Sequence, residues 1–512
     1  MDVGGGEGHA APPNQTRTDL GMVTLAVALK KFRRSGGAVL PDWYGRPDEC
    51  QPGVDGPKFP GIDSKRQAEL SVYLEAMTST RRPPLVSCDV APRPSLYQEV
   101  WWKLTASQTE GFPYALFPTV IDLGMTDIRM ALRAIRATLD RHRVLRSIFL
   151  AKSERLEVEF CSADDVEIRV SSVLSESALL ELMQVERATA VPITMKPPLR
   201  IHLVTHGSRL LAFFTFHHAI IDHMSVRILE RELRGCLKRG GVALEESQSR
   251  LDFYDWAAWE RSWFESTAGS QVCGYWRDWR ARVPSLCSPT LKNLEWVRGT
   301  RTKHKVHMNT AMVEKIGKRA RRLGTTPFLV ILCAYVTALR RWSGKLHFPV
   351  RAVGNSRVGP LAASGVGLFM CHDPIEVDLQ GLASTDDLIE ALCAEYRSSV
   401  ALRIPTHMTG SGADYDALHS SIGASINFVP EAAGRSGVSS SEQPAISLSE
   451  PDEEPTDWLV PQPSIVLELI GRRGALSGYL AFNDKIIGGD EQRFAVNLFG
   501  EAIWTALDAR PI

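Results

Sequence analysis

Two adjacent histidines followed by an aspartate are the strongest candidates for chemistry in this sequence. The run FHHAIIDHMS places His217, His218, Asp222 and His223 within seven residues. A neutral imidazole titrates near pH 7, so it can take a proton from an attacking amine or alcohol. An aspartate four residues beyond His218 can stabilise the local backbone or pair with a distant cation, and so hold the histidines in place. The run therefore predicts a proton-transfer centre.

The same run admits other interpretations. If His217 and His218 occupy consecutive extended positions, their side chains point to opposite faces of the strand. We therefore expect one histidine to face the reacting groups and the other to support it. The structural alternative is two core histidines beside a helix cap that satisfy each other. A metal site is a third possibility, but no H-E-x-x-H or CxxC motif accompanies the run. The sequence near the histidines has no GxSxG elbow to present a nucleophilic serine, so it does not favour covalent catalysis. Direct transfer between two substrates is the simplest chemistry.

The flanking sequence predicts how these residues are positioned. Two strand-like runs at 199–206 and 209–216 are separated by only two residues, which predicts an antiparallel hairpin. The histidines follow the second run directly. Asp222 or Ser225 then caps a helix that reaches about Lys238. A strand end, a loop and a helix start are therefore expected to meet at one spot.

Helical and strand-like stretches alternate along the rest of the chain, which indicates a mixed α/β enzyme core. Apolar periodicity predicts a helix at 126–142. A helical block at 312–344, interrupted at Gly324 and Pro327, predicts a helix, a turn and a more buried helix. Residues 431–461 are rich in Ser, Glu and Pro and predict a mobile excursion. Strands are expected to follow near 464–470 and 476–482.

Length and composition limit the function classes. At 512 residues the chain exceeds the roughly 100–200 residues of one domain, so two or three folded units are expected. Its 59 basic and 59 acidic residues balance, so the chain has no overall electrostatic field that would attract nucleic acid or an acidic membrane. The nine cysteines occur singly, which favours a reducing compartment. With no secretory signal and no apolar run of membrane-spanning length, we expect a cytoplasmic protein.

The N-terminal part of the chain differs from this core. Residues 1–18 are Gly/Pro-rich and polar and are expected to be a disordered tail. Residues 19–77 carry a helix-like apolar stripe that stops at Gly36, short extended pieces, and a second helix opened by Ser64. These features predict a small mini-domain. Adjacent prolines in residues 78–90 favour an extended linker, after which the core begins.

The run FHHAIIDHMS is one of a series of motifs along the chain. It resembles the HHxxxDGxS signature of the condensation-domain superfamily, which includes chloramphenicol acetyltransferase-like folds, and the series resembles that family's motifs in their order. The other segments similar to family motifs are SLYQEVWW (95–102), RHRVLRSIF (141–149), DFYDWAAWE (252–260), GYWRDWRA (274–281), TTPFLVILCAYVTALRRWSG (325–344), GNSR (354–357), VGLFMCHD (366–373) and INFVP (426–430). The match covers roughly residues 90–510.

The resemblance implies an α/β fold of two chloramphenicol acetyltransferase-like lobes that form a V-shaped pseudo-dimer with a tunnel between them. The lobes are expected at residues 91–285 and 286–512. Residues 19–77 resemble the small α/β docking domains that capture a tail of an upstream carrier protein. An extension that merely packs on the core remains the alternative for that segment.

By the same resemblance, His218 is the catalytic residue, and His217 and Asp222 support it. Arg357, at the end of GNSR, is expected to be the cation that pairs with Asp222. His223 replaces the Gly that usually follows the aspartate, and is expected to narrow the tunnel or contact the acceptor. The further residues expected to bind substrate or support the site are Ser225, Cys371 and His372. No metal is expected.

The implied function is transfer of an acyl or polyketide chain to a free amine or alcohol, forming an amide or ester and releasing the product. The donor is a phosphopantetheine thioester on a separate carrier protein, because the chain has no carrier serine motif and no adenylation signature. No bound cofactor, nucleic acid or membrane partner is expected. An epimerisation-type domain is one alternative, since SVRIL (225–229) resembles its SWRIL segment. A catalytically silent recruitment module of the same fold is another.

Overall fold

A computed structural model represents the 512-residue chain. It describes residues 92–106, 116–152, 155–242, 252–284, 286, 299–357, 364–403, 423–430, 446–458, 465–472, 474–484 and 486–511. The expected tail, mini-domain and linker at 1–18, 19–77 and 78–90 lie outside the described residues and stay predictions. The expected lobe boundary between residues 285 and 286 also stays a prediction.

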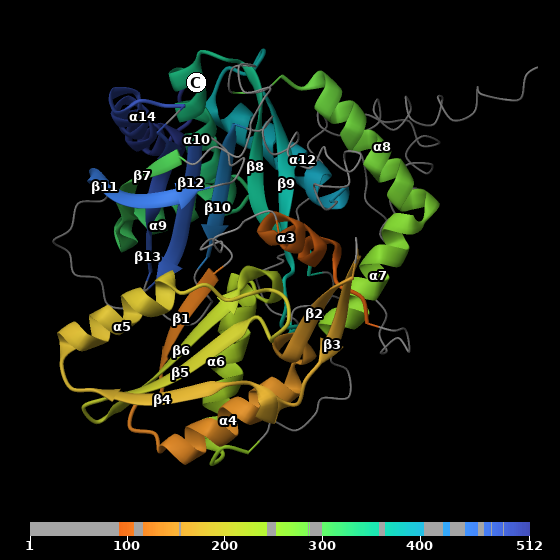
Figure 1. The fold of residues 1–512 in the computed structure, drawn as a ribbon. Coiled ribbons are helices and arrows are strands. Elements are labelled where there is room, and N and C mark those ends of the chain that lie inside the picture. Colours follow the sequence, from red (N-terminus) through yellow and green to blue (C-terminus); the bar gives the residue numbers. More distant parts are fainter. Residues whose placement is uncertain are drawn as a thin grey trace, which may run out of the picture.

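A four-stranded sheet with helices on both faces forms what we call the N-terminal lobe (Figure 1). Its strand order is β1-β6-β5-β4, with β4 parallel to β5 and the other pairs antiparallel. The elements are β1 (Leu116–Asp122), β4 (Ile168–Val173), β5 (Leu199–His206), β6 (Arg209–His217), α4 (Ile128–Arg141), α5 (Glu176–Ala188) and α6 (His223–Lys238). Alternate residues of β6 face opposite sides, so Phe214 packs toward α4 and α6, and Phe213 packs against α5.

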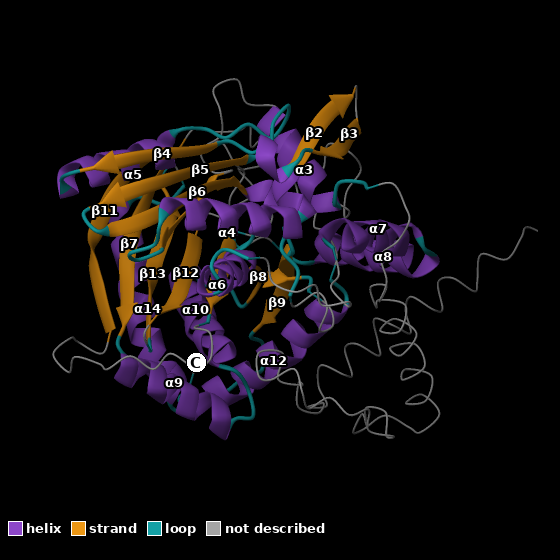
Figure 2. Ribbon diagram, turned by 90° about the horizontal axis from the view of Figure 1, so that it is seen from below, coloured by secondary structure: helices purple, strands orange, loops and turns teal. Residues whose placement is uncertain are grey.

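A seven-stranded sheet and its helices form what we call the C-terminal lobe. The strand order is β11-β7-β13-β12-β10-β8-β9, and β10 runs parallel to both of its neighbours. The strands are β7 (Gly299–Met308), β8 (His347–Asn355), β9 (Met370–Asp378), β10 (Ala424–Val429), β11 (Ile446–Trp458), β12 (Ile465–Arg472) and β13 (Ala475–Asn483). The helices are α9 (Thr310–Arg322), α10 (Pro327–Ser343), α12 (Thr385–Ala401) and α14 (Gly489–Leu507). Figure 2 shows these four helices on one side of the sheet.

Three further helices and a hairpin complete the described part of the fold. They are α3 (Leu96–Ala106), α7 (Phe253–Glu265), α8 (Thr267–Arg282) and the antiparallel pair β2 (Ser147–Lys152) and β3 (Arg155–Phe160), with 3₁₀ turns at Arg143–Arg146, Ala163–Asp165 and His218–Ile220. The indole of Trp276 on α8 donates to the carbonyl oxygen of Leu402, just beyond α12, at 2.6 Å. This bond joins α8 to the C-terminal lobe.

Local sequence signals account for the helices of the core. Asp127 caps α4 by accepting from the amide of Met130 at 3.1 Å, and Asn309 caps α9 in the same way. Gly324 has φ +59°, a left-handed conformation that favours glycine, and Pro327 opens α10 at a position that lacks an amide partner anyway. The predicted helix at 126–142 and the helix-turn-helix at 312–344 are confirmed.

The length and burial of α10 bear on membrane insertion. In the part of the chain that the structure describes, no single helix has both the length and the apolarity to cross a bilayer. Among the described helices, α9 and α10 together have the length and composition for a span, but they bend by 102° at the break between them. Every residue of α10 from Leu329 to Leu339 is buried inside the lobe.

The expectation of an excursion at 431–461 is wrong for residues 446–458. These residues form β11, which pairs antiparallel with β7 at the edge of the seven-stranded sheet. An edge strand pairs its backbone on one side only and tolerates polar, Pro-containing sequence, so its composition resembled that of a loop. Residues 431–445 and 459–461 lie outside the described residues. The strands expected near 464–470 and 476–482 are confirmed as β12 and β13.

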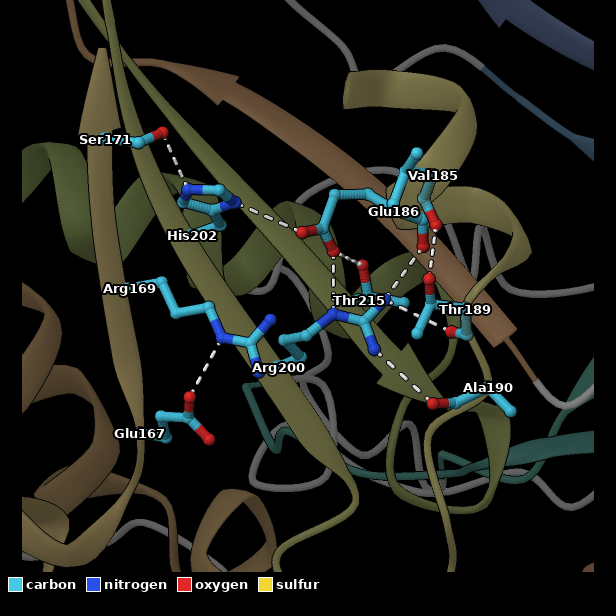
Figure 3. A network of polar contacts seen from close by, with 10 residues as sticks. All are labelled: Glu167, Arg169, Ser171, Val185, Glu186, Thr189, Ala190, Arg200, His202 and Thr215. Carbon is cyan, nitrogen blue, oxygen red and sulfur yellow. Dashed lines mark hydrogen bonds and ion pairs between the residues drawn. The ribbon is translucent and has the colours of Figure 1, made fainter. Parts of the chain in front are cut away.

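A buried carboxylate joins α5 to the sheet of the N-terminal lobe (Figure 3). Glu186 of α5 accepts from Arg200 Nε at 2.7 Å and pairs with His202 Nδ1 at 3.1 Å, both on β5. The other ring nitrogen of His202 lies 2.8 Å from the hydroxyl of Ser171 on β4. Burial by itself raises the pKa of Glu186, but the hydrogen bonds from Arg200 and His202 outweigh burial and lower it.

Replacing Glu186 with glutamine should lower the free energy of unfolding at pH 7 by about 3 kcal/mol, because it leaves Arg200, whose side chain is only 12% exposed, without its anion. The pKa of Glu186 is lower in the folded state, so its stabilisation is present above the unfolded pKa of about 4.3. That stabilisation is lost as pH falls through the folded pKa. Denaturant unfolding of both proteins at several pH values measures the difference.

Glu167→Gln is the matched control for this prediction. Glu167 pairs with Arg169 at 2.8 Å on the same sheet, but both side chains are more than half exposed. Exposed pairs contribute about 0–1 kcal/mol, so this substitution should have little effect. Equal losses of stability in the two variants would contradict the role given to Glu186.

Candidate active site

The two histidines lie where β6 ends and the chain turns into α6. The amide of His217 still donates to the carbonyl of Pro198 at 2.9 Å, and Leu116 of β1 is its partner in the strand register. His218 opens the 3₁₀ turn His218–Ile220. The expectation that both histidines occupy extended positions is therefore wrong for His218, because the chain must reverse direction within a few residues to begin α6.

The hydrogen bonds of the two rings give them opposite tautomers. Nδ1 of His218 lies 3.0 Å from the carbonyl oxygen of Ile221, and a carbonyl only accepts, so this nitrogen carries the proton. Nε2 of His218 therefore keeps its lone pair. Nδ1 of His217 instead accepts from the amide of Ala219 at 3.1 Å, which places the proton of the neutral ring on Nε2. Only His218 has its lone pair on the outer nitrogen, where it can act as a base.

Aromatic rings enclose His218. Trp101 of α3 stacks on its imidazole with centroids 5.1 Å apart, and Phe117 of β1 meets it edge-on at 5.4 Å. Trp101 also meets His217 edge-on at 6.2 Å. These contacts restrict the orientation of the His218 ring. The family resemblance includes the motif that contains Trp101, but the sequence assigns neither Trp101 nor Phe117 to the site.

Burial keeps the imidazoles of the site neutral. It lowers the pKa of His218, and the Ile221 carbonyl and Asp222 only partly offset that effect. His217 is 1% exposed, and burial together with His218 lowers its pKa to about 3. His223 has its pKa lowered to about 4 by burial and by Arg227 and Arg472. All three rings are therefore uncharged near pH 7, the state in which an imidazole can accept a proton.

Asp222 caps α6 and binds the C-terminal lobe with the same carboxylate. It accepts from the amide of Ser225 at 2.7 Å and from the amide of Phe369 at 3.0 Å. Arg357 approaches it with two guanidinium nitrogens at 3.0 and 3.2 Å, and both side chains are less than a tenth exposed. The predicted pairing of Asp222 with Arg357 is present. The carboxylate is directed to these backbone amides and to Arg357, and its geometry is that of a support.

Ser225 extends this contact between the lobes. Its hydroxyl donates to the carbonyl oxygen of Gly367 at 2.8 Å and accepts from Arg357 at 2.6 Å and from the amide of Gly367 at 3.0 Å. A Cβ at Gly367 would overlap the ring of Phe253, so this close approach requires glycine. We call Asp222, Ser225, Arg357, Gly367 and Phe369 the inter-lobe clamp.

The remaining predicted residues lie on β9, next to the clamp. Cys371 is buried in the apolar core of the N-terminal lobe, with its sulfur 3.9 Å from a carboxylate oxygen of Asp373. The amide of His372 donates to the hydroxyl of Tyr97 on α3 at 3.2 Å, and the two rings meet edge-on. Both residues therefore lie at the junction of the lobes. Their role in substrate binding stays a prediction.

Across the described ranges, no group of three or more His, Cys, Asp or Glu side chains is placed to hold a metal ion. The site offers instead a neutral imidazole held in one tautomer between aromatic rings. Such a group can take a proton from a nucleophile and return it to a leaving group.

Comparison with known proteins identifies relatives for more than half of the chain. The family model described as Condensation domain matches residues 99–407. A linear gramicidin synthase of Brevibacillus parabrevis is 26% identical over 347 residues, or 65% of this chain. Phosphinothricin tripeptide synthetase PhsB of Streptomyces viridochromogenes is 26% identical over 355 residues, or 64% of this chain. The matches span only 4% and 29% of the length of these two relatives.

Solved structures show the same architecture. The structure described as the molecular basis for condensation domain-mediated chain release from the enacyloxin polyketide synthase has a TM-score of 0.75 at 27% identity, and the match covers 94% of this chain and 96% of that one. The SgcC5 protein of Streptomyces globisporus has a TM-score of 0.63 at 17% identity, covering 82% of this chain and 100% of that one. The predicted α/β fold of two chloramphenicol acetyltransferase-like lobes is confirmed.

Proposed function

This chain belongs to the condensation-domain family, and on that premise we propose that it transfers an acyl or polyketide chain from a carrier-protein thioester to a free amine or alcohol. The product is an amide or an ester, and it leaves the carrier. The donor arrives on the phosphopantetheine arm of a separate carrier protein, and the chain itself uses no cofactor.

The observation that carries this proposal is the state of His218. Its Nδ1 is occupied by the Ile221 carbonyl, so Nε2 is the nitrogen left to accept a proton. Its pKa lies below the ordinary value of 6.5, so the ring is neutral near pH 7. Trp101 and Phe117 hold the ring in place. A preoriented neutral imidazole is what a direct transfer between two substrates requires.

The proposed step balances with the groups already described. Nε2 of His218 takes the proton of the acceptor as its nitrogen or oxygen attacks the thioester carbonyl. The tetrahedral intermediate then collapses, the carbon–sulfur bond breaks, and the thiolate of the phosphopantetheine arm takes the proton from His218. The net result is one new C–N or C–O bond and one free thiol. His217 and Asp222 act as positioning residues.

The test is turnover of the full chain with acylated carrier proteins from assembly lines and a panel of small amines and alcohols, followed by mass spectrometry. We expect loss of the acyl group from the carrier together with a new amide or ester of the acceptor. Acyl loss that yields only free acid would indicate a hydrolase. Stable binding of carriers with no acyl loss across the panel would support a recruitment module and overturn the proposal.

The N-terminal residues 19–77 are proposed to dock the carrier protein. Deleting residues 1–80 should then raise the KM for carrier-bound donor several-fold and leave the KM for an N-acetylcysteamine thioester unchanged, because the small thioester has no carrier to dock. Steady-state kinetics with both donors measures this difference. Equal losses with both donors would indicate a role in folding.

A further inference from the structure

A histidine and two arginines lie near His218, beside the ring of Phe117. His223 begins α6, and its ring lies 5.9 Å from Phe117, the same ring that meets His218 at 5.4 Å. One turn further along α6 is Arg227, and at the end of β12 is Arg472. The two imidazoles thus contact one phenyl ring. The charges of Arg227 and Arg472 both act on His223 and lower its pKa.

The topology explains why β12 ends near α6. A guanidinium nitrogen of Arg227 donates to the carbonyl oxygen of Pro430 at 2.8 Å, directly after β10. Because β10 and β12 are parallel, with Val429 opposite Ile470, Arg472 lies two residues beyond that pair at the same edge of the sheet. Figure 1 shows both strands pointing toward the N-terminal lobe. Arg472 therefore lies at the end of the sheet that faces α6, close enough for its charge to lower the pKa of His223.

The described carboxylates around this cluster are held by other groups. Asp222 is a carboxylate whose charge acts on His223, and its two oxygens are engaged by Arg357 and by the amides of the clamp. Glu468 of β12 accepts from the side-chain amide of Asn427. Arg472 is exposed, and no described carboxylate forms an ion pair with it. An anion from outside the chain can therefore bind here.

Resting on the proposed function, we propose that His223, Arg227 and Arg472 bind a carboxylate of the acceptor, which is therefore a small amino acid or hydroxy acid. Arg472 supplies the planar pair of donors that matches a carboxylate, and the neutral ring of His223 donates a single hydrogen bond. Arg227, held by the Pro430 carbonyl, adds positive charge. With its carboxylate at this cluster, the acceptor presents its amine or hydroxyl to His218 around the ring of Phe117.

The test compares acceptors that differ only in this carboxylate. The pairs are β-alanine against β-alaninamide, at equal concentrations of free amine, and 3-hydroxybutanoate against 3-hydroxybutanamide, with the octanoyl thioester of N-acetylcysteamine as donor. The wild type should prefer the carboxylate member about tenfold or more in kcat/KM, as expected for one charge-assisted contact at a partly exposed site. Arg472→Ala should remove the preference and leave the rate with the amide unchanged.

Arg322→Ala is the control, because Arg322 is an exposed arginine at the end of α9, remote from this cluster. It should keep the preference of the wild type. Equal use of both members of each pair by the wild type would overturn the inference but not the proposed transfer. If none of the four acceptors is acylated, saturation-transfer NMR measures the binding of the same compounds. Tighter binding of the carboxylate members that Arg472→Ala abolishes would support the proposed carboxylate site. Equal binding of both members of each pair would reject it.

Discussion

Replacing His218 with alanine should lower the rate of the proposed acyl transfer by about 10²–10⁴-fold, because it removes the group that we propose takes and returns the proton. His218 is partly exposed, and its main contacts are with Trp101, Phe117 and one carbonyl, so the fold should persist. The rate constant is measured by mass spectrometry of product, with circular dichroism to verify folding. A variant that releases product as fast as the wild type would remove His218 from the mechanism.

The pH profile provides a second readout of the same residue. In the proposed mechanism the neutral ring is the active form, and its pKa lies below 6.5, so the wild-type rate with an alcohol acceptor should be constant at neutral pH and fall as pH is lowered through that pKa. The acid limb of kcat/KM should therefore have a midpoint below 6.5, and it should be absent from the residual activity of His218→Ala. His206→Ala, at a partly exposed histidine at the end of β5, should behave as wild type.

Replacing Arg357 with alanine should lower the free energy of unfolding by about 3–5 kcal/mol, because the carboxylate of Asp222 remains buried without its cation. The guanidinium also donates to Ser225 and to the carbonyl of Gly365, and its carbon lies 4.1 Å from the centroid of the Phe369 ring. Arg357→Lys keeps the charge without the planar fork, so it should recover only part of the loss. Denaturant unfolding measures these differences.

Two comparisons test whether the clamp acts as a unit. The double variant Asp222→Ala/Arg357→Ala should lose clearly less free energy of unfolding than the two single variants lose together, because it leaves no unpaired charge. Arg341→Ala breaks an exposed pair with Glu501 and should cost less than about 1 kcal/mol. Additive losses at Asp222 and Arg357 would show that the two side chains do not depend on each other.

Local signals in the sequence were sufficient for the elements around the site. The two-residue connection between β5 and β6 predicted the hairpin, and Asp222 was correctly considered as the cap of α6, because turn and cap residues act through their immediate neighbours. The partner of Asp222, Arg357, lies 135 residues away and was found only through the family motif that contains it.

The surroundings of His218 depend on contacts that periodicity does not encode. Phe117 reaches the histidines because β1 pairs with β6 in a particular register, and a single sequence does not specify which strands become neighbours. Arg472 joins His223 only because β12 ends at the same sheet edge as β10. The tautomers of the two rings depend on single hydrogen bonds to the local turn, which no residue pattern reports.

The position of the inter-lobe clamp has a consequence for how the lobes can move. Asp222 and Ser225 lie within a few residues of His218, so this buried polar contact between the lobes is also close to the proposed reacting centre. In a rotation about such a pivot, each atom travels in proportion to its distance from the pivot. If the lobes rotate about the clamp to admit the proposed carrier protein, their far ends therefore move farthest, while His218 stays almost stationary.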